Sequence, residues 1–328
     1  MYKHLIFKVL ILLLVNFNCL SQIHIKGVVL KEKDKTPIPY AAIGILNTTV
    51  GTISELDGTF QITVPRNLIR NDLLCSALGF ERTNISLTDI NNAGTEVTIL
   101  LKEKIIVLEE VTVKSNNRLR RFEFGNREFD GGSMYAHTEA AGSAMVMLVD
   151  NGFPHYSGFK FPALLEKIFL RIVNNTFSEF KLRLRLYAFD SISGLPGKDL
   201  LDKDIFVHDK IRNGWLELKL SEHNIILNGP FFLGFEWILD VKGRGFLHKQ
   251  YSEWYRKHPQ LVTRDSIKIG AESVQYSNYN GTLWPGTSFG SSATSENAPK
   301  YKCYYRFNSF GKWYVSPTAL CMKIMVLI

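Results

Sequence analysis

The chain has 328 residues, of which 45% are hydrophobic and 12% aromatic, and it carries a formal net charge of +8 at pH 7. This composition excludes a disordered chain, and the length is sufficient for two domains with cores of their own. The basic residues are mostly interleaved with apolar ones, so we expect no nucleic-acid partner. After residue 22, no run reaches the roughly 18 apolar residues of a membrane-spanning helix, so no transmembrane segment is predicted in the mature chain.

Residues 1–22 have the pattern of a secretory signal peptide. A basic start is followed by the apolar run Val9–Val15, which is too short to span a bilayer as a helix. We expect cleavage after Ser21. The alternative is a lipoprotein acylated at Cys19, although the residues before it lack the small side chains that such a site prefers. The protein is therefore predicted to be exported to the periplasm, the outer-membrane surface or the extracellular space.

Residues 23–114 contain short strand-like runs separated by turn-rich pieces such as TDINNAGT. The runs, in chain order, are IHIKGVVL, YAAIGIL, GTFQITV, DLLCSAL, RTNISL, EVTILL and LEEVTV. They predict a seven-stranded β-sandwich. Within TISELDGTFQITVP, Asp57-Gly58 is predicted to be a hairpin turn. A calcium site is disfavoured there, because calcium takes about six or more oxygen ligands and only Glu55 is nearby.

Five segments of this region follow one another in a distinctive order: IKGVVL, TPIPYAAI, GTISELDGTFQITVP, LLCSALGF and VTILLKEKIIVLEEVTV. In that order they resemble the carboxypeptidase regulatory-like domain. This transthyretin-like module often precedes the plug of TonB-dependent receptors in Bacteroidota. The resemblance implies a transthyretin-like sandwich in a cell-envelope protein. It implies no activity, because no histidine begins the HxxE motif of a zinc carboxypeptidase and the chain is too short for a receptor barrel.

Residues 115–133 are rich in arginine and glycine and are predicted to be a solvated linker, with an arginine patch for an anionic partner as the alternative. Residues 134–328 are again strand-rich and predict a jelly-roll-like β-sandwich of eight to ten strands, so the whole chain is expected to be all-β. In KLRLRLYAF, Lys181, Arg183 and Arg185 alternate with leucines, which predicts one buried face and one basic face.

The succession of segments from KIFLRIVN to GFEWI is similar to a β-sandwich module of uncharacterised Bacteroidota surface proteins. It is also loosely similar to galactose-binding-like domains. No binding residue follows from either likeness.

Three cysteines remain after the predicted signal peptide. Cys75 lies in an apolar run and is expected to be a buried free thiol. Cys303 and Cys321 lie in strand-like segments, where an exported protein can hold either a disulfide or two free thiols, and the sequence leaves both open. The cysteine spacing lacks CxxC, so no zinc site is expected.

Aromatic residues are concentrated in residues 251–314, which hold 14 Phe, Trp and Tyr in 64 positions. Trp254 and Tyr255 lie in a polar stretch, and Trp284 lies in a loop-like segment rich in Gly, Ser and Asn. These three residues are candidates for ligand binding, as stacking platforms for a sugar or a surface for a protein partner. The alternative is that the rings fold back to cap the sandwich.

The sequence contains no GxSxG elbow, P-loop or GxGxxG, so no catalytic residue and no cofactor is predicted. Glu236, inside the apolar run FFLGFEWIL, is expected to point to solvent. The predicted function is therefore that of a non-catalytic, exported cell-envelope protein that binds a glycan or an envelope protein. The alternative is a secreted, glycan-active hydrolase whose catalytic carboxylates, Glu236 among them, lie on the second domain.

Overall fold

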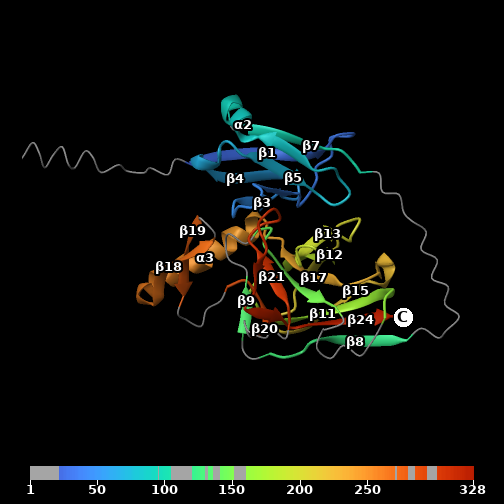
Figure 1. Ribbon diagram of the computed structural model, residues 1–328. Coiled ribbons are helices and arrows are strands. Elements are labelled where there is room, and N and C mark those ends of the chain that lie inside the picture. Colours follow the sequence, from blue (N-terminus) through green and yellow to red (C-terminus); the bar gives the residue numbers. More distant parts are fainter. Residues whose placement is uncertain are drawn as a thin grey trace, which may run out of the picture.

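The structure is a computed structural model, and it describes residues 22–94, 96–104, 120–129, 132–135, 141–150, 160–269, 272–279, 285–293 and 301–328. The predicted signal peptide therefore lies outside this range, except for its last residue. Within the range, five β-sheets and two α-helices make up the regular structure (Figure 1). The all-β prediction is confirmed. Neither described helix combines the length and the hydropathy that crossing a membrane requires.

The first seven strands form two small sheets around one core. They are β1 (Gln22–Lys31), β2 (Ala42–Gly44), β3 (Gly51–Ile53), β4 (Thr59–Pro65), β5 (Asp72–Ser76), β6 (Thr83–Ser86) and β7 (Glu96–Leu101). One sheet has the order β4-β1-β7 and the other β3-β2-β5-β6. Alternation along β4 buries Phe60, Ile62 and Val64 and exposes the residues between them. These side chains join buried residues of the other sheet, such as Ile43 and Leu73, in one apolar core.

The Asp57-Gly58 pair turns the chain, but the flanking strands β3 and β4 do not form the predicted hairpin, because they belong to different sheets. Gly58 has φ +76°, a left-handed conformation that glycine adopts without strain. A carboxylate oxygen of Asp57 accepts hydrogen bonds from the backbone amide of Thr59 at 3.0 Å and from its hydroxyl at 2.6 Å. These two bonds lower the pKa of Asp57. The Asp57 carboxylate therefore stabilises the turn in which it lies.

The turn-rich piece TDINNAGT is helical in the structure, contrary to the sequence interpretation. It forms most of α2 (Leu87–Ala93), a helix capped by Ser86, whose hydroxyl accepts from the amide of Asp89. Gly94, with φ +107°, ends the helix. Leu87 and Ile90 are the two buried residues of α2, and two apolar positions are too few to show a helical period in the sequence.

The remaining strands build a second, larger sandwich. They are β8 (Arg121–Asn126), β9 (Gly132–Tyr135), β10 (Ala144–Val149), β11 (Ala163–Asn175), β12 (Phe180–Phe189), β13 (Pro196–Asp199), β14 (Phe206–Asp209), β15 (Gly214–Lys219), β16 (Ile226–Leu227), β17 (Phe231–Trp237), β18 (Val262–Ile269), β19 (Glu272–Tyr279), β20 (Thr287–Ala293), β21 (Cys303–Arg306), β22 (Tyr314–Val315), β23 (Thr318–Leu320) and β24 (Met322–Leu327). This is more than the eight to ten strands expected, because several edge strands have only two to four residues.

Two of its sheets are large. The seven-stranded sheet has the order β13-β12-β17-β10-β21-β22, with β14 paired to β12. The eight-stranded sheet has the order β23-β20-β11-β24-β8, with β15 and β16 paired to β11 and β9 paired to β20. β8 lies inside the predicted linker, so part of residues 115–133 belongs to a sheet. β18 and β19 form a separate hairpin.

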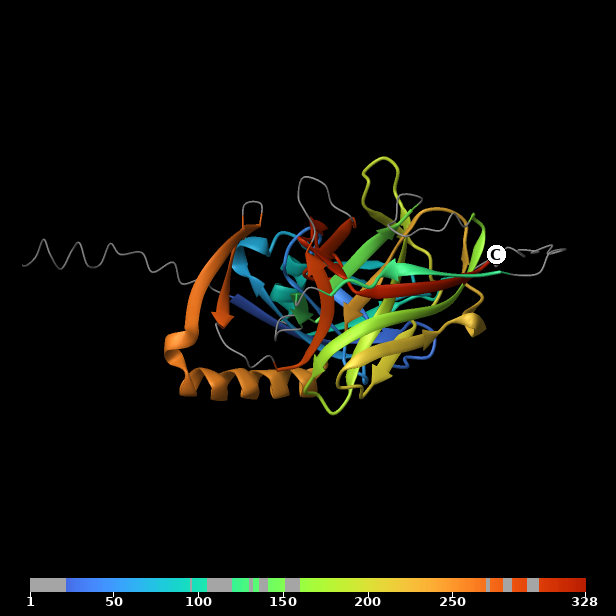
Figure 2. The ribbon, with the colours of Figure 1, turned by 90° about the horizontal axis from the view of Figure 1, so that it is seen from below.

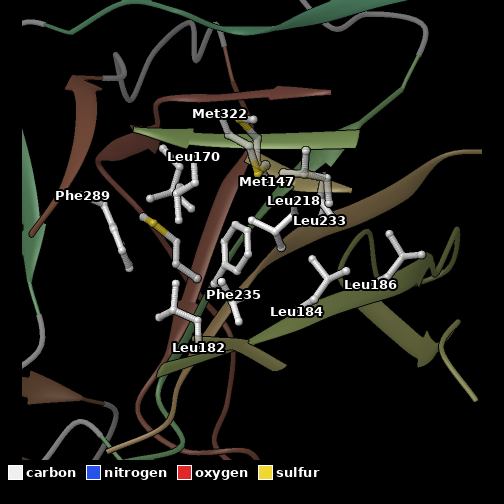
Figure 3. Close-up of a cluster of buried hydrophobic side chains, with 14 of the residues drawn as sticks. Met147, Leu170, Leu182, Leu184, Leu186, Leu218, Leu233, Phe235, Phe289 and Met322 are labelled. Atoms are coloured by element: carbon white, nitrogen blue, oxygen red, sulfur yellow. The ribbon is translucent and has the colours of Figure 1, made fainter. Parts of the chain in front are cut away.

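The two large sheets pack face to face through alternating apolar side chains. Leu182, Leu184 and Leu186 of β12 point into the same core as Leu170 of β11 and Met322 of β24 (Figure 3). Burying one such side chain contributes about 1.5–3 kcal/mol to folding. The leucine face of KLRLRLYAF is therefore buried as predicted.

Helix α3 (Val241–Lys257) was not predicted. It runs along one side of the molecule and leads toward the β18–β19 hairpin (Figure 2). Asp240 caps its first turn by accepting from the amide of Gly243 at 2.8 Å. Leu247, Tyr251 and Trp254 are its buried residues, and their spacing of four and three places them on one face.

The first seven strands lie against the second sandwich (Figure 1). Asn308 donates to the carbonyl of Thr48 at 2.9 Å. Glu55 accepts from the guanidinium of Arg244 and from the amide at the start of α3. Phe310 packs in a small apolar cluster with residues of β2 and β5. Polar and apolar contacts thus join the two sandwiches.

Candidate functional site

A buried cluster of charges lies on one face of the seven-stranded sheet. This face is opposite the one that packs against the eight-stranded sheet. In register, Glu236 of β17 lies opposite Arg183 of β12 on one side and opposite Ala144 of β10 on the other, with Arg306 of β21 next in the row. Arg185 is two residues further along β12. One carboxylate is therefore surrounded by three guanidinium groups.

The contacts within this cluster are short. Arg185 donates from Nε to Glu236 Oε2 at 2.8 Å, and its Nη2 lies 2.7 Å from the same oxygen. Arg183 Nη1 lies 3.2 Å from Oε1, and Arg306 Nη2 lies 3.5 Å from Oε2. The hydroxyl of Ser309 donates to Oε2 at 3.1 Å.

Two further carboxylates balance the arginines. Asp199 pairs with Arg185 at 3.1 Å, and Asp204 lies 3.2 Å from Arg183 Nε. With Glu236 there are three acids for three arginines, so the formal charges cancel. The remaining arginine faces an aromatic ring, because the Arg306 guanidinium lies 4.5 Å from the centre of the Trp313 ring.

Two sequence expectations are wrong here. Glu236 does not point to solvent, since it is 0% exposed, and the basic face of β12 is buried, since Arg183 is 1% exposed. The two errors have one cause. Glu236 and the arginines of β12 lie on adjacent strands and neutralise each other, so both can be buried. A paired charge can be buried where an isolated one cannot.

The electrostatics of the cluster favour the ionised acid at its centre. Burial acts to raise the pKa of Glu236, but the three arginines outweigh it and hold the pKa below its usual range. Burial raises the pKa of both Asp199 and Asp204. Glu236 is thus an ionised carboxylate whose two oxygens are already contacted by arginine side chains. It suits a structural role, since a general acid needs a raised pKa and a nucleophile needs access to substrate.

A second candidate site is a cavity of about 130 Å³ between the two large sheets. Its lining residues are Ser143, Ala144, Met145, Phe235, Trp237, Phe289, Tyr305, Arg306, Phe307 and Leu320. Along β21 and the residue after it, side chains alternate, and Tyr305 and Phe307 meet in an edge-to-face contact with ring centres 5.5 Å apart. The guanidinium of Arg306 points to the opposite face, toward Trp313.

The walls of this cavity are mostly apolar. Trp237 stacks on Phe289 with ring centres 4.5 Å apart and an angle of 9°. Hydroxyl groups are supplied by Ser143 and Tyr305, and burial raises the pKa of Tyr305, which keeps its phenol neutral. The volume is close to that of an engineered cavity of roughly 150 Å³ that binds benzene. The cavity therefore suits one aromatic ring or one branched aliphatic group.

Comparison with known families identifies the first sandwich. Residues 25–113 match the family model described as the CarboxypepD_reg-like domain. The first sandwich is therefore similar to a carboxypeptidase regulatory-like domain, and it is called the regulatory-like domain below. The match spans 89 of 328 residues, no peptidase or receptor-barrel family matches, and the family supports a non-catalytic β-sandwich domain.

No curated protein matches the chain. A matching solved structure, titled "Structure of infectious bursal disease virus Gx strain", is 9% identical with a TM-score of 0.22. The alignment covers 94% of this chain and 64% of that one, so the chain spans less than two thirds of its length. A likeness this low says nothing about the function of the second sandwich.

The regulatory-like domain closes the buried charge cluster. The backbone carbonyl of Tyr40 accepts a hydrogen bond from Arg183. The Tyr40 hydroxyl lies 3.5 Å from Lys181 Nζ, which in turn pairs with Asp240 at 2.8 Å. The cluster is therefore completed by the contact between the two domains.

The two predicted aromatic candidates that the structure describes lie elsewhere. Trp254 is 8% exposed, on the buried face of α3, and stacks on His258 with ring centres 5.1 Å apart. Tyr255 is the next residue and is 37% exposed, while Trp284 lies outside the described residues. Neither Trp254 nor Tyr255 lines the cavity. Its aromatic walls were missed because residues of three separate strands and a following loop residue meet there.

The cysteines are free thiols. Cys75, Cys303 and Cys321 are all buried, and neither of the last two is in a disulfide. Burial raises the pKa of Cys75 and of Cys303 to about 12, which makes these thiols unreactive at neutral pH. No three His, Cys, Asp or Glu side chains in the described part of the chain are grouped to hold a metal ion.

Proposed function

We propose that this chain is a non-catalytic, exported protein of the cell envelope that binds a partner protein in the cavity of its second sandwich. The observation that carries the proposal is the aromatic, almost uncharged wall of that cavity. At about 130 Å³ the cavity is smaller than the roughly 300–1,000 Å³ of pockets that bind whole small molecules, so it suits a single inserted side chain. Export is supported by the signal-like residues 1–22, and an envelope location by the resemblance of residues 23–114 to a module that often precedes the plug of TonB-dependent receptors.

The cavity favours a protein group over a sugar. A sugar ring carries several hydroxyl groups that need partners when buried, and each one left unpaired costs about 1–3 kcal/mol. Ser143 and Tyr305 satisfy at most a few of them. The side chain of a Phe, Tyr or Leu matches both the volume and the polarity, and such a residue in a pocket is the usual anchor of a protein interface.

Glu236, the acid that the hydrolase alternative names, gives that alternative no support. Glu236 is ionised, fully buried and contacted by three arginines, so it can neither donate a proton nor reach a substrate. We assign it to stability.

Photo-crosslinking in cells that naturally make the protein tests the proposal. A benzophenone amino acid at Phe307, in the cavity wall, should yield one discrete adduct with an envelope protein. The same group at Tyr255, on the exposed side of α3, is the matched control and should not yield that adduct. Identical adducts from both positions, or none from Phe307, would overturn the proposal.

A further inference from the structure

The outer face of the eight-stranded sheet carries an exposed tryptophan among positive charges. Trp215, on β15, is 37% exposed. Arg171 of β11 lies directly opposite it in register, and Phe169 lies opposite Glu217. Lys323 of β24 lies opposite Phe169 on the other side. Because side chains of a strand alternate, these residues share the face that points away from the sandwich core.

The Trp215 ring is contacted by a lysine. Lys323 Nζ lies 4.3 Å from the centre of the Phe169 ring and 5.0 Å from that of Trp215. The lysine therefore crosses over Phe169 and fixes the indole through cation–π contacts on both rings. A surface ring fixed before binding loses less conformational freedom when a ligand stacks on it.

The guanidinium beside Trp215 is also held. Arg171 Nη2 donates to the side-chain oxygen of Asn213 at 3.0 Å, and Asn213 Nδ2 donates to the carbonyl of Val173 at 2.6 Å. Gly290 leaves space for Arg171, because a Cβ there would lie 2.7 Å from Arg171 Cγ. The fixed arginine and the fixed indole are cross-strand neighbours, whose Cβ atoms lie about 4.5–5.5 Å apart in such pairs.

The charges of this face do not cancel. Lys167 pairs with Glu217 at 2.8 Å, and Lys323 with Glu123 at 3.4 Å. Arg171 and Lys219 have no carboxylate partner among the described residues. Lys167, Arg171, Lys219 and Lys323 outnumber the carboxylates Glu217 and Glu123, and Glu123 is shared with Arg127 at 2.6 Å. The described residues of this face therefore carry a surplus of positive charge, part of it directly beside the exposed indole.

We propose that this face binds an acidic glycan, with a uronic acid ring stacked on Trp215 and its carboxylate paired with Arg171. A sugar ring offers a flat C–H face to the indole, and a carboxylate is the group that a guanidinium binds best. An acidic peptide would satisfy Arg171 but would leave the indole without a flat partner. The surface is separate from the cavity, so this inference does not depend on the proposed protein partner.

Calorimetric titration of the full mature chain tests the assignment. The probes are oligogalacturonate, hyaluronan fragments and alginate fragments, with a neutral galactan of matched length and poly-glutamate as comparisons. At least one acidic glycan should bind about tenfold more tightly than the neutral one. Trp215→Ala should weaken that binding about tenfold or more, and Arg171→Gln should remove the preference for the acidic chain.

Two control variants test whether the binding belongs to the Trp215 face. Tyr255→Ala removes an aromatic residue of equal exposure on α3 and should leave binding unchanged. Phe307→Ala alters the cavity and should also leave it unchanged. No binding of any of the three acidic glycans, unchanged binding by Trp215→Ala, or equally tight binding of poly-glutamate would each overturn the proposal.

Discussion

At the scale of single residues, Glu236 has the most demanding environment. It is fully buried, yet its pKa is lowered, because three arginines approach the two oxygens of one carboxylate. Such an arrangement is weak evidence of added stability, since replacing the whole set with apolar residues is often neutral. Breaking it is different, because removal of one partner leaves buried charge without compensation.

Replacing Glu236 alone should therefore destabilise the fold strongly. Glu236→Gln keeps the shape of the side chain but leaves three arginines facing two aspartates. We expect the free energy of unfolding in urea to fall by about 3–5 kcal/mol. The matched control is Glu217→Gln, which breaks the exposed pair with Lys167 and should cost about 1 kcal/mol or less. Equal, small losses in the two variants would contradict a central role for Glu236.

The cost of Glu236→Gln should depend on pH in a defined direction. The pKa of Glu236 is lower in the folded chain than in the unfolded chain, where it is about 4.3. Its charge therefore contributes stability above that pH, and the contribution is lost as the pH falls through the lower, folded value. The difference in unfolding free energy between wild type and variant should be constant near neutrality and shrink in acid. A difference that grows on acidification would show that the pKa is raised.

At the scale of elements, the sequence showed the period-two patterns of the strands but not which groups would pack against them. The alternation in GTFQITV and KLRLRLYAF predicted strands and their apolar faces. It did not show that the other face of β12 would be covered, because the covering groups, Glu236 and the carbonyl of Tyr40, are remote in the sequence. Helix α3 was missed because Gly243 and Gly245 weaken its first turns. The spacing of Leu247, Tyr251 and Trp254 was the available signal.

The position of Trp254 on the buried face of α3 gives a prediction about the helix. Trp254→Ala should lower the free energy of unfolding by about 3–5 kcal/mol, because it removes a large side chain that is 8% exposed. Tyr255→Ala, one residue along, should change it by about 0.5 kcal/mol or less. Urea denaturation followed by circular dichroism measures both. A Trp254→Ala chain of unchanged stability that loses binding of a sugar would restore the stacking-platform interpretation.

At the scale of the whole molecule, the regulatory-like domain is built into the second sandwich. The carbonyl of Tyr40 accepts a hydrogen bond from Arg183. The carboxylate of Glu55 accepts hydrogen bonds from Arg244 and from the first amide of α3. Phe310 reaches back from the second sandwich into a cluster with Ala42 and Leu74. The family match could identify the module, but each contact that joins it to the rest also needs a partner outside the matched range, such as Arg183, Arg244 or Phe310.

These contacts predict that the two sandwiches unfold together. Calorimetry of the mature chain should give one cooperative transition, because each domain stabilises groups of the other. Phe310 is 9% exposed, and Phe310→Ala removes the apolar part of the contact at a cost of about 3–5 kcal/mol. We expect this variant to unfold in two separate transitions. Val315→Ala, at a position that is 73% exposed, truncates a nearby side chain outside the contact and should keep a single transition. Two transitions in the wild-type chain would mean that the domains are energetically independent despite their contact, since a shared transition requires coupling between them.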